Sequence, residues 1–189
     1  MRGMPGYAMR VGRFLKTKNA LGITQNHSEY KMIDFVARIS FDGAHKEKKL
    51  YLDCNRKVSQ KHHLIKSYQD EEIQIKYSIS GKNEFIKKTN DKRFFVLACT
   101  NKVDIANLKK SQKKRDIGMK SDPELLLDLY LEYGEDILKT LSFGFIFILI
   151  DYKNKTVKAY RDHIGIKNFC YYQLDTTIYL ASSFKIYSN

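Results

Sequence analysis

Several stretches of the chain place apolar residues as β-strands do. From Glu72 to Ile79 every second side chain is apolar, which predicts a strand buried on one face. Phe94–Cys99 and Phe145–Ile150 are apolar throughout, and strands of this kind need cover on both faces. Further strands are expected at Thr156–Tyr160, Asn168–Leu174 and Thr177–Ala181. Strands that are apolar on both faces predict a layered structure.

The first third of the chain gives weaker signals. Glycine and proline interrupt residues 1–25, which predicts loops there, with one strand at Ala20–Thr24. Met32–Ile39 and Lys49–Asp53 alternate around Asp42-Gly43, so a hairpin is the interpretation. The lysine-rich stretch Ile105–Lys114 is interpreted as a solvated connection, with a short helix as the alternative.

One helix has clear start and stop signals. Ser121 or Asp122 is suited to cap its N-terminus, Pro123 fits the first turn, and leucines recur at helical spacing up to Tyr133. Gly134 then offers a left-handed stop. With a second short helix at Glu135–Leu141, the pattern predicts an α+β fold of stacked antiparallel β-sheets flanked by helices.

Length and composition favour one domain spanning residues 1–189. A chain of 189 residues with 43% hydrophobic residues buries one substantial core. Its longest apolar run, Phe143–Ile150, is far shorter than the roughly 20 residues that cross a bilayer, so no membrane partner is expected. Nothing at the N-terminus resembles a signal peptide, which leaves the cytoplasm as the expected location.

The charge balance raises the question of a polyanionic partner. The formal net charge is +13, but the basic residues are mostly lysine and are spread along the chain. Lys109–Arg115 is the one dense run, and no aromatic-basic motif of an RNA-binding module accompanies it. The sequence therefore argues against nucleic acid as the partner, while a basic binding module that uses this run stays an alternative.

Five segments in the second half follow one another in an order that is diagnostic. In this order they read S-D-P-E-L-L-L from Ser121, Y-G-E-D-I-L from Tyr133, F-G-F-I-F-I-L-I-D from Phe143, Y-R-D-H-I-G-I-K-N-F-C-Y-Y from Tyr160, and L-A-S-S-F-K from Leu180. This stretch, from about Ser121 to Tyr187, resembles the class II, N-terminal nucleophile type of glutamine amidotransferase domain in glutamine-hydrolysing asparagine synthetases. The resemblance implies that family's layered fold.

Shorter fragments of the family pattern lie upstream. Arg2-Gly3 with Pro5 is similar to the family's H-R-G-P-D loop, and residues 95–107 are similar to its strand that ends in N-G-E-I-Y-N. This alignment places the family's first strand and its leading cysteine before Met1. The domain is therefore expected to be incomplete at its N-terminus, and the synthetase half is expected to be absent because its phosphate loop would follow the last residue.

The resemblance implies a chemistry that needs particular groups. In the family an N-terminal cysteine attacks the glutamine amide, with its own α-amine as base. Here Cys54, Cys99 and Cys170 are all internal, and their odd number fits reduced thiols rather than disulfides. The family's oxyanion Asn-Gly pair is missing, since Lys102 follows Asn101, and the arginine that clamps the substrate carboxylate is replaced by Ala20. No residue of this chain is assigned a catalytic role.

A vestigial glutamine site is what the resemblance leaves. Asp122 stands where the family's aspartate binds the substrate amino group, and a helix cap is its alternative role. The vestigial site also includes Asn101, on the asparagine of the family's N-G-E-I-Y-N motif, and Arg2 and Gly3, in its H-R-G-P-D loop. Arg161-Asp162 and Gly165 are interpreted as a structural turn.

No cofactor or metal site is expected, because His62-His63 lacks a second ligand pair. The leading hypothesis is an asparagine synthetase-like amidotransferase domain that does not hydrolyse glutamine and contacts an ATP-dependent synthetase partner. An active glutaminase, with glutamine as its partner and a cysteine-led start upstream, is an alternative.

Overall fold

The computed structural model of the protein describes residues 9–14, 34–42, 63–80, 85–100, 104, 106–108, 120–141 and 144–182. Its strands are β1 (Met9–Phe14), β2 (Phe35–Ser40), β3 (His63–Gln69), β4 (Ile73–Ser80), β5 (Ile86–Lys88), β6 (Phe94–Cys99), β7 (Ile146–Asp151), β8 (Thr156–Asp162), β9 (Cys170–Leu174) and β10 (Thr177–Ala181). Its helices are α2 (Asp122–Tyr133) and α3 (Asp136–Lys139).

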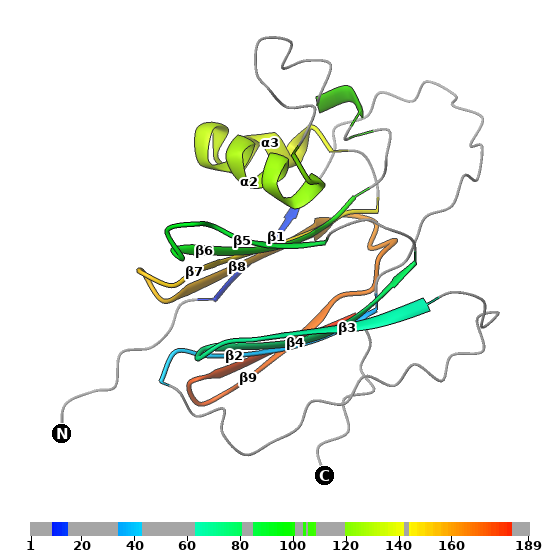
Figure 1. Cartoon of the computed structure of the whole chain (residues 1–189). Coiled ribbons are helices and arrows are strands. Elements are labelled where there is room, and N and C mark those ends of the chain that lie inside the picture. The colour runs from blue at the N-terminus through cyan, green and yellow to red at the C-terminus, as the bar shows by residue number, and fades with distance from the viewer. Residues whose placement is uncertain are drawn as a thin grey trace.

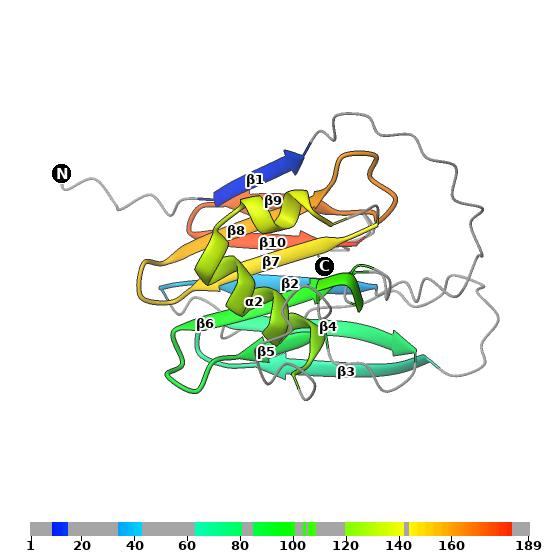
Figure 2. The same ribbon diagram turned by 90° about the horizontal axis from the view of Figure 1, so that it is seen from above.

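The strands form two five-stranded sheets that stack face to face. Sheet A has the order β1-β8-β7-β6-β5, and sheet B has the order β3-β4-β2-β10-β9. Figure 1 shows three layers, with α2 and α3 over sheet A and sheet B beneath it. Seen from above, α2 runs obliquely across the sheet (Figure 2). The predicted layered α+β architecture is confirmed.

Sheet A is buried on both faces, which explains its uninterrupted apolar strands. In β6, Phe95, Leu97 and Cys99 pack into the core between the sheets, whereas Phe94, Val96 and Ala98 pack under the helices. β7 divides its residues in the same way. The sequence pattern predicts burial of Leu125, Leu129, Phe145, Phe147 and Leu149, and each of them is at most 4% exposed. Each strand of this kind therefore contributes to two cores.

The helix α2 begins and ends at the predicted residues. Ser121 holds the N-cap position with extended backbone angles, but its side chain makes no capping hydrogen bond. Asp122 is the first helical residue, so it is not the cap. At the other end Gly134 has φ +65°, and its N–H donates to the Tyr130 carbonyl at 2.8 Å. A residue with a Cβ rarely adopts this φ, which is why glycine ends the helix.

Three features of the first half differ from the sequence prediction. The predicted hairpin of Met32–Ile39 with Lys49–Asp53 is wrong. Strand β2 pairs with β4 on one side and with β10 on the other, so neither of its edges is free for a further strand. Residues 9–14, expected to be irregular, form β1, which pairs in parallel with β8. Strand β3 was not predicted. Residues 49–53 and the strand expected at 20–24 lie outside the described residues.

A carboxylate ties the two sheets together at one end of the molecule. Asp70 lies in the β3–β4 turn of sheet B, and its Oδ2 accepts hydrogen bonds from Lys88 Nζ at 2.7 Å and Tyr152 Oη at 2.7 Å, both in sheet A. Tyr68 Oη donates to the same oxygen at 2.8 Å. The other oxygen accepts two backbone N–H groups of its own turn. The side chain thus bonds both layers at once.

The leucine at the centre of α2 gives a test of the helix packing. Leu129 is 1% exposed in the core between the helices and sheet A. We expect Leu129→Ala to lower the free energy of unfolding by about 2 to 5 kcal/mol, because the removed methyl groups leave a cavity. Urea denaturation of the two proteins measures the difference. A loss below about 1 kcal/mol would contradict inward packing of this face.

The Asp70 tie predicts a pH-dependent contribution to stability. Burial raises the pKa of Asp70, but hydrogen bonds from Lys88, Tyr152 and Tyr68 outweigh burial and lower it to about 2. A lowered carboxyl pKa stabilises the fold above the unfolded pKa, and this stabilisation disappears as pH falls through the folded pKa. We expect Asp70→Asn to cost roughly 1 to 2 kcal/mol at pH 7, after a discount for partial exposure.

Denaturation of wild type and Asp70→Asn from pH 7 to pH 2 measures this linkage. The gap between the two proteins should be constant down to about pH 4 and then close as Asp70 protonates. Asp175→Asn is a suitable control, since Asp175 lies in the exposed turn between β9 and β10. A gap that stays constant down to pH 2 would show that the ionised carboxylate does not supply the stability.

Candidate functional site

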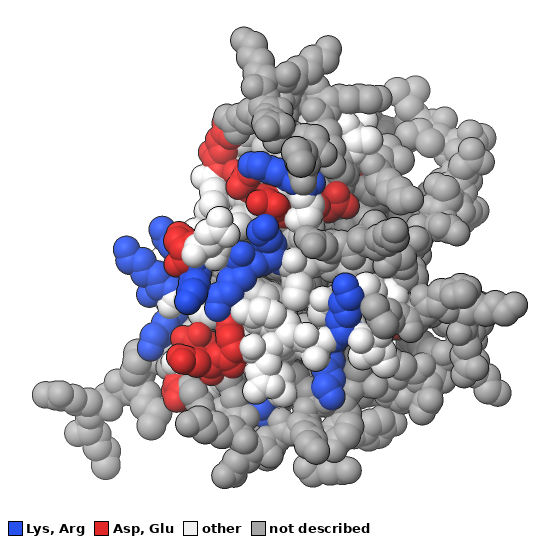
Figure 3. Space-filling view, viewed as in Figure 1, with Lys and Arg blue, Asp and Glu red and all other residues white. Residues whose placement is uncertain are grey.

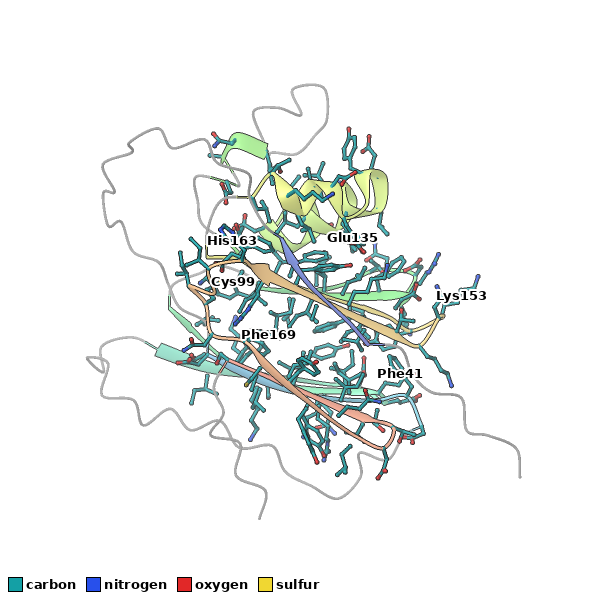
Figure 4. All side chains as sticks on the ribbon, turned by 180° about the vertical axis from the view of Figure 1, so that it is seen from behind. Phe41, Cys99, Glu135, Lys153, His163 and Phe169 are labelled. Carbon is teal, nitrogen blue, oxygen red and sulfur yellow. The ribbon has the colours of Figure 1, made fainter. Side chains whose placement is uncertain are left out.

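Parts of three sequence motifs, those that begin at Ser121, Tyr160 and Leu180, lie at the end of the sandwich opposite Asp70. Strands β6 and β8 both run toward this end, and their register places Cys99, Ile146 and Arg161 in one row across sheet A. Figure 4 shows Cys99, His163 and Phe169 at this end, whereas Lys153 and Phe41 lie at the other. We call it the β6 end. The N-terminal end of α2 lies toward it as well (Figures 1 and 2).

Asp122 is presented by the first turn of α2 at the β6 end. Its side chain is partly exposed, and Glu124 in the same turn forms an ion pair with Lys87 of β5 at 3.5 Å. The N-terminal end of a helix carries positive potential, which stabilises an ionised aspartate there. The helix therefore presents the Asp122 carboxylate at the end where its own dipole is positive.

Two hydroxyl groups at the β6 end are buried with unfilled hydrogen-bonding capacity. Thr100 follows β6 and Ser121 precedes α2, a helix that packs on β6. Neither Thr100 Oγ1 nor Ser121 Oγ has a hydrogen-bond partner in the described part of the chain. Leaving such a group buried and unpaired costs roughly 1 to 3 kcal/mol, and a polar ligand or water would recover that cost. The sequence did not single out Thr100.

The segment after Thr100 brings a further carboxylate into the fold. Asp104 and residues 106–108 are helical, which agrees with the alternative interpretation of this stretch. Asp104 is 4% exposed, while Asn107 is exposed. Leu108 packs with α2 and sheet A, so the segment is anchored next to the helix. Of the two polar residues here, Asp104 is the one turned into the protein.

The Arg161–Gly165 turn is structural, as the sequence indicated. Asp162 Oδ1 accepts hydrogen bonds from the N–H groups of Gly165 at 2.8 Å and Ile166 at 3.2 Å. Gly165 has φ +74°, a backbone conformation that residues with a Cβ rarely adopt. The Asp-x-x-Gly spacing thus closes a tight turn whose glycine has a steric reason.

The Ala-Ser pair that ends β10 also has a structural role. Ser182 Oγ accepts a hydrogen bond from the Phe35 N–H at 3.0 Å, and the Ser182 N–H donates to the Phe35 carbonyl at 3.0 Å. This exchange fixes the end of β10 to the start of β2. Phe35 also stacks on Phe169, with ring centroids 6.5 Å apart. The motif therefore secures sheet B at the β6 end.

The two described cysteines are poorly placed to act as nucleophiles. Cys99 is 3% exposed, and its side chain belongs to the core between the sheets. Cys170 is 8% exposed, donates its S–H to the Ala181 carbonyl at 3.2 Å, and has its pKa raised by burial. A nucleophilic thiol needs access and thiolate character, and burial opposes both. Cys54 lies outside the described residues.

Several predicted positions cannot be placed. Arg2, Gly3 and Asn101, together with Ala20 and His62, lie outside the described residues. Among the residues that the structure describes, no three His, Cys, Asp or Glu side chains cluster as metal ligands would. In that same part of the chain, no helix has the length and apolar character needed to cross a membrane.

The polar side chains at the β6 end thus include the Asp122 carboxylate and the hydroxyls of Thr100 and Ser121, which have no hydrogen-bond partner among the described residues. Such a set suits a small polar molecule that carries an ammonium group. The described residues here include no accessible thiol and no pair of groups arranged as nucleophile and base.

Comparison with known proteins agrees with the motifs. Residues 70–189 match the family model described as a glutamine amidotransferase domain. This match begins at the β3–β4 turn and covers most of both sheets and both helices.

Curated relatives match a shorter region. Asparagine synthetase 2 (glutamine-hydrolyzing) of Oryza sativa subsp. japonica is 35% identical over 83 residues, which is 43% of this chain and 14% of the relative. The asparagine synthetase (glutamine-hydrolyzing) of Zea mays gives the same values, and asparagine synthetase 3 (glutamine-hydrolyzing) of Arabidopsis thaliana is 34% identical over 83 residues. The matched region is thus about one seventh of these relatives.

Proposed function

Because this chain belongs to the glutamine amidotransferase family, we propose that it is an asparagine synthetase-like amidotransferase domain that retains a glutamine-binding site but does not hydrolyse glutamine. Its match to residues of glutamine-hydrolyzing asparagine synthetases supports the substrate class. The observations that carry the proposal are Asp122 in the first turn of α2 and the buried hydroxyls of Thr100 and Ser121, which have no hydrogen-bond partner in the described part of the chain.

The binding step follows from the charges at the β6 end. The ionised Asp122 carboxylate attracts the α-ammonium group of glutamine, and charge-assisted hydrogen bonds of this kind are the stronger ones. The Thr100 and Ser121 hydroxyls donate or accept hydrogen bonds with the remaining polar atoms, which relieves their own unpaired state. These three side chains orient the ligand.

The chemical step requires groups that the 189-residue polypeptide does not provide. Amide cleavage in this family's manner needs a thiol and a free α-amine on one residue. In a polypeptide that begins at Met1, Cys54, Cys99 and Cys170 are internal, and Cys99 and Cys170 are buried. Asn101-Lys102 also replaces the Asn-Gly pair that would stabilise the oxyanion. Binding therefore proceeds without hydrolysis.

A synthetase-type partner fits this function. The relatives matched here are named asparagine synthetases, and the matched region is 14% of their length. We propose that the domain works next to an ATP-dependent synthetase domain, either in one chain or as a separate protein. The domain uses no cofactor of its own in this proposal.

The positive charge of the chain does not require a nucleic-acid partner. Described basic side chains form ion pairs with acidic ones, including Lys88–Asp70 at 2.7 Å and Arg93–Asp151 at 3.4 Å. Figure 3 shows Lys and Arg next to Asp and Glu on this face rather than in a field of one sign. The run Lys109–Arg115 lies outside the described residues.

The binding step is tested with one aspartate variant and a matched control. We expect Asp122→Asn to weaken L-glutamine binding roughly 10- to 100-fold, because it removes a charged hydrogen bond worth about 1.5 to 3 kcal/mol. Asp136→Asn makes the same charge change beyond the other end of α2, at the exposed Lys139 ion pair, and it should bind like wild type. Calorimetry measures all three proteins. Equal affinity of wild type and Asp122→Asn would refute the role of Asp122.

The chemical step is tested by ammonia release from L-glutamine with the purified 189-residue polypeptide. We expect this polypeptide to release ammonia no faster than a triple variant that carries Cys54→Ser, Cys99→Ser and Cys170→Ser. The reason is that loss of the N-terminal nucleophile removes the covalent route. Steady release that the triple variant lacks would identify an internal nucleophile and contradict the proposal. Release that appears only when a cysteine-led segment is restored upstream would instead support an active enzyme.

A further inference from the structure

Strand β9 is an edge strand without the usual protection against pairing. It is the last strand in sheet B, and the described residues place no strand along its outer side. The other three edge strands contain basic residues, namely Arg10 and Arg13 in β1, Lys66 in β3, and Lys87 and Lys88 in β5. Residues 168–174 contain no charge and no proline. Lysine and proline are the common means of blocking edge pairing, and β9 has neither.

The same strand exposes large apolar and aromatic side chains. Tyr171, Tyr172 and Leu174 are 55%, 59% and 48% exposed. Tyr172 already pairs with Tyr179 of β10 across the sheet, with ring centroids 6.3 Å apart. An exposed apolar edge with an open hydrogen-bonding side marks an interaction surface.

The register shows which backbone groups face outward. A two-residue loop, Asp175-Thr176, joins β9 to β10, so its closing pair Leu174–Thr177 exchanges hydrogen bonds. Hydrogen-bonded and non-hydrogen-bonded pairs then alternate along the hairpin. The N–H and C=O groups of Tyr171 and Gln173 consequently point away from β10. These four groups are available to another strand.

We propose that the occupant of this edge is β9 of a second copy of the chain, added antiparallel about a two-fold axis at Tyr172. Tyr171 of each copy then lies opposite Gln173 of the other, and each such pair exchanges two backbone hydrogen bonds. The two B sheets join into one of ten strands. Tyr179 and Tyr172 of both copies form a continuous aromatic row on one face, which extends a contact that each copy already has.

Charge favours this edge over the other three for pairing between two copies. Two chains of net charge +13 repel each other, and charged side chains on the facing strands would add to that repulsion. Among the four edges of the described sheets, β9 alone carries no charged side chain. This self-pairing is independent of glutamine chemistry.

The affinity is expected to be modest and to depend on salt. A five-residue strand buries less than the roughly 800 Å² per partner of a standard interface, so we expect a dissociation constant of roughly 10 to 500 µM. Raising NaCl from about 50 to 300 mM should tighten the dimer severalfold, because salt screens the repulsion. Association driven by opposite charges would weaken instead.

Analytical ultracentrifugation of the 189-residue chain between about 5 and 500 µM tests the pairing. Gln173→Pro removes an outward N–H and leaves the bonds to β10, and Gln173→Lys adds a charge to the edge, so each should weaken the dimer at least about tenfold. Ser67→Lys adds the same charge to β3, the other edge of sheet B, and should dimerise like wild type. If circular dichroism shows that Gln173→Pro is unfolded, the dimerisation of Gln173→Lys alone tests the proposal.

A cross-link gives a second readout that does not depend on affinity. Residue 172 meets its own symmetry mate as a non-hydrogen-bonded pair, with Cα atoms about 4.5 Å apart, which suits a disulfide. Tyr172→Cys should therefore form a reducible dimer on mild oxidation, whereas Ser67→Cys should not. A wild-type chain that stays monomeric at about 500 µM, a dimer that both Gln173 variants leave intact, or equal cross-linking of both cysteine variants would overturn the proposal.

Discussion

The apolar character of both faces of sheet A is the constraint on which the rest of the structure depends. Strands β6 and β7 have no polar side to turn toward water, so one face must be covered by α2 and α3 and the other by sheet B. The helix has to begin and end where it does to cover that face, and the Gly134 stop serves this packing. A protein with a polar face on sheet A would not need a third layer.

The two ends of the sandwich differ in the hydrogen bonding of their polar side chains. At one end the Asp70 carboxylate is saturated by five donors, two of which come from the opposite sheet. At the β6 end Thr100 and Ser121 keep buried hydroxyls without a partner in the described part of the chain. The saturated Asp70 carboxylate holds the sheets together, whereas the unpaired hydroxyls at the β6 end are groups that a polar ligand could satisfy. Residues of three family motifs lie at that second end.

The sequence predicted well those features that local pattern determines. The two-sided strands β6 and β7, the helix α2 and the turn at Gly165 follow from residue spacing, and the structure has them. It failed at β2, whose neighbours β4 and β10 lie far away in the chain. The Asp70 cluster was equally hidden, because Lys88 and Tyr152 are 18 and 82 residues away and no local pattern links them.

The site itself was predicted only in part. Asp122 was found because a family motif contains it, and the motif fixes its position at the start of α2. Thr100 was not found, since a threonine after a strand is ordinary in sequence and only its burial without a partner distinguishes it.

An NMR titration of the isotope-labelled polypeptide with L-glutamine tests the central claim most directly. The account predicts amide shift changes centred on Thr100, Ser121 and Asp122, with Asp70 and Tyr152 unmoved at the opposite end. Changes centred on the Asp70 end, or none at about 50 mM glutamine, would contradict it.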